Sequence, residues 1–217
     1  MKKDDAIFNV LRDYIKKSKQ IRFEGDGYSD SWRQEAEKRH LSNHAKTPEA
    51  LKAKIAPKYL DLFQKVGVMN ETEVRARYDV ELTDYVKHIQ IEARVLGDIA
   101  RNHIIPTAIR YQNILIKNVK GLKTIYEADY KKYAGEQLYI LEAISRHIEE
   151  INSGITKMID TRKKANKVDD MEKRATIYCE EVRPYFDTIR YHCDKLEMLV
   201  DDQLWPLAKY RELLFTH

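Results

Sequence analysis

One stretch, residues 70–122, constrains the fold of this chain more than any other. Its apolar residues recur at intervals of three and four, the spacing that puts side chains on one face of an α-helix. They are Tyr78, Leu82, Tyr85, Ile89, Ala93, Leu96 and Ala100, then Ala108, Tyr111, Leu115, Val119 and Leu122. The pattern predicts one amphipathic helix of roughly 75 Å, whose apolar face needs partner helices to cover it.

Particular residues predict how this helix begins and where it bends. Asn70 is followed three residues later by Glu73, which is the spacing of a capping box. Pro106 has no backbone N–H and its ring clashes with the preceding turn, so we expect a kink or a break there.

Two more long helices follow. The first covers about residues 136–166, and the second begins at Asp169 or Asp170. Their apolar stripes are Leu141, Ile144, Ile148, Ile151, Ile155 and Met158, and Met171, Ala175, Tyr178, Val182, Tyr185, Ile189, His192, Leu196 and Leu199. The short link 166–168 predicts an antiparallel hairpin that covers the face of 70–122. Pro184 indicates either a second kink or a later helix start.

The N-terminal part reads as short elements. Helices are expected over 4–19, over about 30–39 from a cap at Ser29 or Asp30, from Thr47 onward, and over 58–66. Residues 21–23 suggest a brief strand, and residues 24–28 a turn that lacks the glycines and lysine of a phosphate-binding loop. The C-terminus reads as a turn at Trp205-Pro206 and a helix over 207–214.

The predicted fold class is therefore all-α: an antiparallel bundle of three long helices with several short N-terminal helices. We expect residues 1–69 to form short helices and turns, and residues 70–217 to form the bundle with its Trp-Pro tail. Hydrophobic residues make up 43% and charged residues 34% of the 217 residues, with only seven glycines and five prolines. That composition is typical of long, solvent-exposed helices.

Charge and cysteine content exclude several function classes. The net charge of +4 is spread through the chain without a basic block, which argues against nucleic-acid binding. No run of about 18 apolar residues predicts a membrane span, and the first residues lack the apolar stretch of a signal peptide. Cys179 and Cys193 lie on one predicted helix, too far apart to form a disulfide. Two free thiols fit a cytoplasmic protein.

No residue is assigned a catalytic, cofactor-binding or metal-binding role. A di-iron bundle needs Glu-x-x-His on two facing helices, and this spacing occurs at Glu37 and His40 on a short helix. The pairs His88 and Glu92, and His147 and Glu150, each share a helix face and could hold a metal, but solvated polar faces explain them as well. His192 lies on an apolar stripe, where a histidine is ordinarily a core residue with a hydrogen-bond partner.

Three segments together resemble one known family. They are 23–32 with 35–39; Ile91–Arg94 with Ala100-Arg101, Ile105-Pro106 and 108–113; and the tail 200–207 with 210–215. Their order and spacing are similar to the C-terminal helical region of type III glutamine synthetases, the large bacterial form. One departure is Ala208, where the family has a second proline.

The resemblance implies a C-terminal, non-catalytic helical domain with a structural or assembly role, with residues 1–69 linking it to a catalytic portion. For the intact family it implies ligation of ammonia to glutamate with ATP and magnesium, in a cytoplasmic dodecamer of two stacked rings. The family's catalytic motifs have no counterpart here, so this chain alone is expected to be inactive. Its expected partners are its own copies or the catalytic portion. The alternative is a free-standing helical interaction module without enzyme activity.

Polar residues on the long helix leave one question open. Glu92, Arg94, Arg101, Arg110 and Gln112 exceed what a solvated face requires. We expect them to bond within the bundle, and the alternative is contact with a catalytic portion.

Overall fold

The computed structural model describes residues 3–215, and within them it confirms the all-α prediction, since these residues contain helices and no strand. The chain divides into two compact units, one up to Ala45 and one from Lys46. In the second unit the short helices α3 and α4 contact α5.

The first unit contains α1 (Lys3–Lys17), a 3-10 turn (Lys19–Ile21) and α2 (Asp30–Lys38). Ser29 caps α2, because its hydroxyl accepts a hydrogen bond from the backbone N–H of Trp32 at 3.3 Å. No residue of α1 is buried. Its apolar side chains Ile7, Phe8, Leu11, Tyr14 and Ile15 are exposed.

The predicted strand at residues 21–23 is wrong. The 3-10 turn ends at Ile21, and the ring of Phe23 packs against Trp32 with 4.7 Å between ring centroids. The Arg39 guanidinium donates to the carbonyl oxygens of Gln20 and Arg22, both at 3.0 Å. A side chain from α2 thus satisfies backbone acceptors that a strand would offer to a neighbour.

The second unit begins with α3 (Thr47–Lys54) and α4 (Pro57–Lys65), each with proline in its first turn. Gly67 follows α4 with a φ of +66°, a left-handed conformation that glycine adopts without steric cost.

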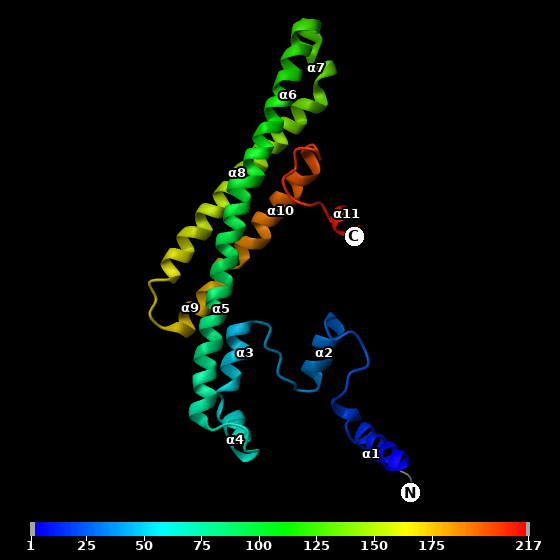
Figure 1. The fold of residues 1–217 in the computed structure, drawn as a ribbon, viewed down its shortest axis with the longest axis vertical. Helices are drawn as coiled ribbons and strands as arrows, with labels where there is room; N and C mark the ends of the chain where they lie inside the picture. Colours follow the sequence, from blue (N-terminus) through cyan, green and yellow to red (C-terminus); the bar gives the residue numbers. More distant parts are fainter. Residues whose placement is uncertain (1–2, 216–217) are drawn as a thin grey trace. The chain divides into compact units, whose positions relative to one another are not determined.

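The long helix consists of α5 (Glu71–Ile99), a π-helical turn (Ala100–Ile104) and α6 (Ile105–Tyr126). Figure 1 shows them as one continuous rod. The capping box is confirmed: Glu73 N–H donates to Asn70 Oδ1 at 2.9 Å, and Asn70 N–H donates to Glu73 Oε2 at 2.8 Å. The helix runs past the predicted end at Leu122.

Pro106 and Pro184 lie inside the long helices, each two residues after the end of a π turn. Ile105, just before Pro106, donates its N–H to Ala100 O, five residues back. Arg183, just before Pro184, does the same to Tyr178 O at 3.0 Å. The wider turn accommodates the proline ring and its missing donor. The disturbance at Pro106 is therefore a π turn in a continuous helix, and Pro184 lies after a π turn within the third long helix, which begins at Met171.

The other two long helices are α8 (Gly135–Ala165) and the run of α9 (Met171–Ile177), a π turn (Tyr178–Val182) and α10 (Pro184–Leu199). Asp170 caps α9, with Lys173 N–H donating to its carboxylate at 3.0 Å. A 3-10 turn (Glu127–Asp129) and α7 (Tyr130–Tyr133) join α6 to α8. In the second unit α8 packs against α6 and α10, and α5 packs against α9 (Figure 1).

The core lies where the stripes meet. Its fully buried side chains include Leu82, Ile144, Ile151, Ile155, Met158, Tyr178, Val182, Ile189 and Leu196. Burial of each such aliphatic side chain is worth about 1.5–3 kcal/mol. The hydrophobic effect along these stripes is therefore the main force that holds the three helices together.

The C-terminal tail corrects one more prediction. Leu204 and Trp205 pack against the core as expected of an apolar turn, but the helix predicted over 207–214 is limited to α11 (Tyr210–Leu213). Glu212 accepts the N–H of Lys209 at 3.0 Å and so fixes the later start. Among residues 3–215, no helix has the length and apolar character needed to cross a membrane.

Candidate functional site

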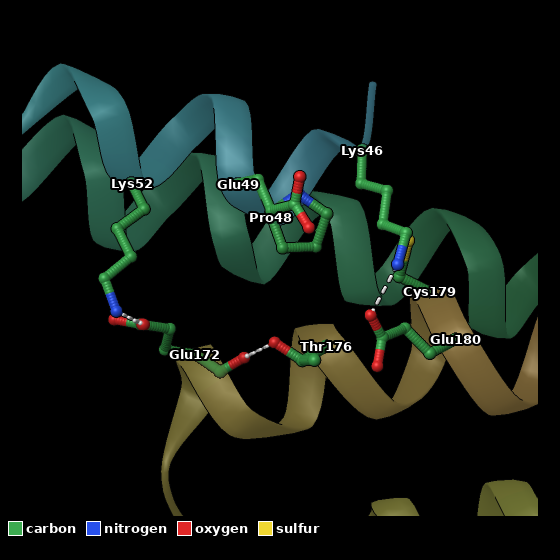
Figure 2. Close-up of a pocket in the computed structure, with 8 residues that line it drawn as sticks. All are labelled: Lys46, Pro48, Glu49, Lys52, Glu172, Thr176, Cys179 and Glu180. Carbon is green, nitrogen blue, oxygen red and sulfur yellow. Dashed lines mark hydrogen bonds and ion pairs between the residues drawn. The ribbon is translucent and has the colours of Figure 1, made fainter. Parts of the chain in front are cut away.

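A cleft of about 170 Å³ lies between α3 and the start of the third long helix (Figure 2). It is lined by Lys46, Pro48, Glu49, Lys52, Glu172, Thr176, Cys179 and Glu180. Figure 2 shows Lys46 and Lys52 extending from opposite ends of α3 toward glutamates on the neighbouring helix.

Two ion pairs close this cleft. Lys46 Nζ lies 2.6 Å from Glu180 Oε1, and Lys52 pairs with Glu172. Glu172 also accepts a hydrogen bond from the Tyr78 hydroxyl of α5 at 3.0 Å. One carboxylate thus joins three helices, α3, α5 and α9.

Both lysines of the cleft are paired with glutamates, and Glu49 adds a third carboxylate to the lining. The hydrogen bond from Lys52, and then that from Tyr78, lowers the pKa of Glu172. Glu180 raises the pKa of Lys46. Burial, together with the Glu172 carboxylate, raises the pKa of Tyr78 to about 12. These pKa shifts favour the charged forms of Lys46 and Glu172, so the ion pairs persist at neutral pH and link α3 to its neighbouring helices.

The cysteines are free thiols, as expected. Cys179 lines the cleft, half-buried, and interacts with the Tyr85 hydroxyl, whose pKa is raised by burial and by this contact. Cys193 is buried, which raises its thiol pKa to about 12. A thiol that stays protonated is a poor nucleophile, so Cys193 acts as a small core residue.

His147 and His192 form a pair between α8 and α10 that sequence reasoning did not foresee. Their Nδ1 atoms lie 2.9 Å apart, a hydrogen bond in which one ring donates and the other accepts. Burial, followed by the proximity of His192, Arg146 and Lys195, lowers the pKa of His147, against a smaller opposing effect of Glu150. His192 therefore has a hydrogen-bond partner, as predicted, but is only half-buried, whereas His147 lies buried and not on a solvated face.

The two other candidate pairs, His88 with Glu92 and Glu37 with His40, do not form a binding site. His88 and Glu92 are exposed on α5, and Glu37 is exposed on α2. His40 ends α2 with a φ of 55°, and the N–H groups of His40 and Leu41 bond to the carbonyls of Glu37 and Ala36 in a Schellman arrangement. The Glu37–His40 spacing thus reflects a helix end.

The polar residues of the long helix bond largely within the bundle. Arg101 donates to Thr156 Oγ1 at 2.9 Å, and Arg110 donates to Thr107 Oγ1 at 2.7 Å. Gln112 donates to Ser145 Oγ and to the Leu141 carbonyl on α8. Glu92 and Arg94 are exposed.

Comparison with known proteins identifies the family. A family model described as the glutamine synthetase C-terminal domain matches residues 6–123, more than half of the chain. This chain belongs to that family.

Relatives of the glutamine synthetase family match nearly the whole chain but only a part of their own length. A glutamine synthetase of Bacteroides fragilis is 44% identical over 99% of this chain and 30% of the relative. A type-3 glutamine synthetase of Dictyostelium discoideum is 27% identical over 97% of this chain and 29% of the relative. A glutamine synthetase of Butyrivibrio fibrisolvens is 26% identical over 98% of this chain and 30% of the relative. The chain spans about 30% of the length of these curated relatives.

The resemblance to the C-terminal region of type III glutamine synthetases is thereby confirmed. Two of its three segments, the turn with α2 and the middle of the long helix, fall inside the residues that match the glutamine synthetase C-terminal domain. The ion pairs of Figure 2 were missed because their partners lie 120 and 134 residues apart in the sequence, where no periodic pattern links them.

Proposed function

We propose that this chain is the non-catalytic C-terminal helical portion of a type III glutamine synthetase-like enzyme and serves its structure or assembly. In the intact enzyme, which we propose is cytoplasmic, ATP and a divalent metal drive the joining of ammonia to glutamate. The observation that carries the proposal is the match to relatives over about 30% of their length.

We assign no residue of this chain to the ATP or the metal of that reaction. Within residues 3–215, no three His, Cys, Asp or Glu side chains gather as metal ligands. The turn at 24–28 is organised by its own contacts, since Asp26 Oδ1 accepts the N–H of Tyr28 at 2.9 Å. We therefore derive no catalytic step from this chain.

Exposed apolar faces support an assembly role. The apolar side of α1 is uncovered in its unit. The long helix carries a second exposed apolar set, Val80, Ile91, Val95, Ile109 and Ile116, apart from its buried stripe. A helix with apolar residues on more than one face is suited to packing against further protein. The proposed occupants are the catalytic portion of the enzyme or further copies of this chain.

The proposal is tested by mixing the purified chain with a Bacteroides fragilis glutamine synthetase truncated to lack the matching region. Light scattering on a size-exclusion column should show the two co-eluting. The double variant Phe8→Asp with Leu11→Asp should weaken the complex, because two charges then lie in the apolar contact.

Val68→Asp, an exposed position outside α1, serves as the matched control and should leave the complex intact. Circular dichroism checks that both variants keep their helical content. Separate elution of the unaltered chain and the truncated enzyme would contradict the proposal and favour a free-standing interaction module.

A further inference from the structure

A second cleft, of about 280 Å³, lies between α5 and α8 beside the first π turn. Its lining consists of Ala93, Arg94, Gly97, Asp98, Arg101, Asn102, Ile155, Ile159 and Arg162. We call it the arginine groove. Three arginines, Asp98 and Asn102 form its polar lining, and its apolar lining comes from Ala93, Gly97 and isoleucines of α8.

The arginine groove carries more positive than negative charge. Asp98 is the acidic residue of its lining, and its carboxylate accepts a hydrogen bond from the Asn102 amide. Arg101 donates to a neutral hydroxyl, Thr156 Oγ1, at 2.9 Å. Among the described residues, no carboxylate forms an ion pair with Arg94, Arg101 or Arg162.

The strongest support for a ligand site in the arginine groove comes from Arg162. Its Nη1 is buried and has no hydrogen-bond acceptor among the described residues, although the side chain also lines the arginine groove. A guanidinium N–H group removed from water without an acceptor is costly. Fold stability alone does not explain why this cation is placed here.

The positive potential extends beyond the lining. Burial raises the pKa of the Tyr178 hydroxyl, and Arg162, Arg174 and Arg94 oppose that rise, so all three lie near the same hydroxyl. The hydroxyl donates to Asn166 Oδ1 at 2.7 Å.

We propose that the arginine groove binds a small oxyanion, the phosphate or carboxylate group of a metabolite, on Arg94, Arg101 and Arg162. Guanidinium groups present paired N–H donors that match the oxygens of such anions. The apolar floor, where Gly97 faces Ile155 and Met158, accepts a small carbon group beside the anion. The inference does not rest on the proposed function, since it concerns groups within one unit.

The test is thermal unfolding of the purified chain in inorganic phosphate, in succinate and in sodium chloride at equal ionic strength. An anion at ten times its Kd should raise Tm by about 3–6 °C above the chloride value. A response to phosphate alone identifies a phosphate site, and a response to succinate alone identifies a carboxylate site. Equal Tm values in all three salts would overturn the proposal.

Variants locate the effect in the arginine groove. Arg94→Gln and Arg162→Gln should each raise the Kd for the responding anion by about tenfold or more, because each removes a charged donor. Arg190→Gln is the matched control, since Arg190 on α10 is exposed and outside the groove lining. Its Kd should equal that of the unaltered chain. An equal loss in all three variants would overturn the assignment.

Arg162→Met adds a readout that needs no ligand. It keeps the apolar stem and removes the cation that lacks a counter-charge. In chloride this variant should unfold at the same or a higher temperature than the unaltered chain. A lower Tm in chloride would show that the protein itself compensates Arg162, and would contradict the inference.

Discussion

His147 and His192 show how a single contact joins two helices. Each residue lies on its own amphipathic helix, and the pair closes a 2.9 Å hydrogen bond between α8 and α10. Because both rings cannot be protonated and keep that bond, the contact requires at least one neutral histidine.

This contact predicts a pH dependence of stability. The pKa of His147 is lowered in the folded chain, while unfolded histidine titrates near pH 6.5. The unfolded chain therefore binds more protons, and the free energy of unfolding should fall as pH falls below about 6.5. Urea denaturation at a series of pH values measures this slope.

His147→Gln should flatten that slope, because the residue that takes up the extra proton on unfolding is gone. His88→Gln, an exposed histidine on α5, is the control and should keep the slope of the unaltered chain. A slope unchanged by His147→Gln would show that other groups carry the pH dependence.

At the scale of the helix, apolar periodicity correctly predicted which residues are buried, and the capping pattern correctly predicted where the long helix begins. The stripe residues Leu82 and Ile89 are buried, and Asn70 forms its capping box, because both depend on neighbours three or four residues away. Pro106 predicted a disturbance but not its form, since either a break or a π turn relieves the clash. The strand expected at Phe23 failed because Arg39, distant in sequence, satisfies that backbone.

The crossing of α8 and α10 depends on a small residue. A Cβ added at Gly154 would lie 3.0 Å from Ile189 Cγ1, closer than ordinary contact. Gly154→Ala should therefore cost about 1–3 kcal/mol of unfolding free energy, despite the better helix propensity of alanine.

The matched control is Gly121→Ala in α6, where an added Cβ meets no other atom within 4 Å. It should stabilise the chain by about 0.5–1 kcal/mol through helix propensity alone. Urea denaturation of both variants gives the comparison. Stabilisation by Gly154→Ala equal to that by Gly121→Ala would contradict the close packing.

At the scale of the whole molecule, the helices pack through their buried apolar stripes, and charged residues form ion pairs between them. The clamp of Lys46 with Glu180 and Lys52 with Glu172 holds α3 to the bundle. Such pairs, like the arginine groove, arise from residues that are distant in sequence and were not predictable from local patterns. The family resemblance, in contrast, rests on short local motifs and could be recognised from the sequence alone.

The chain belongs to the glutamine synthetase C-terminal domain family, and the central proposal is that it does not itself perform the reaction. γ-Glutamyl transfer by the purified chain tests it most directly, with the intact Bacteroides fragilis relative as the positive control in the same assay. The account predicts no transfer above the protein-free background. A rate that scales with the concentration of the purified chain would contradict it.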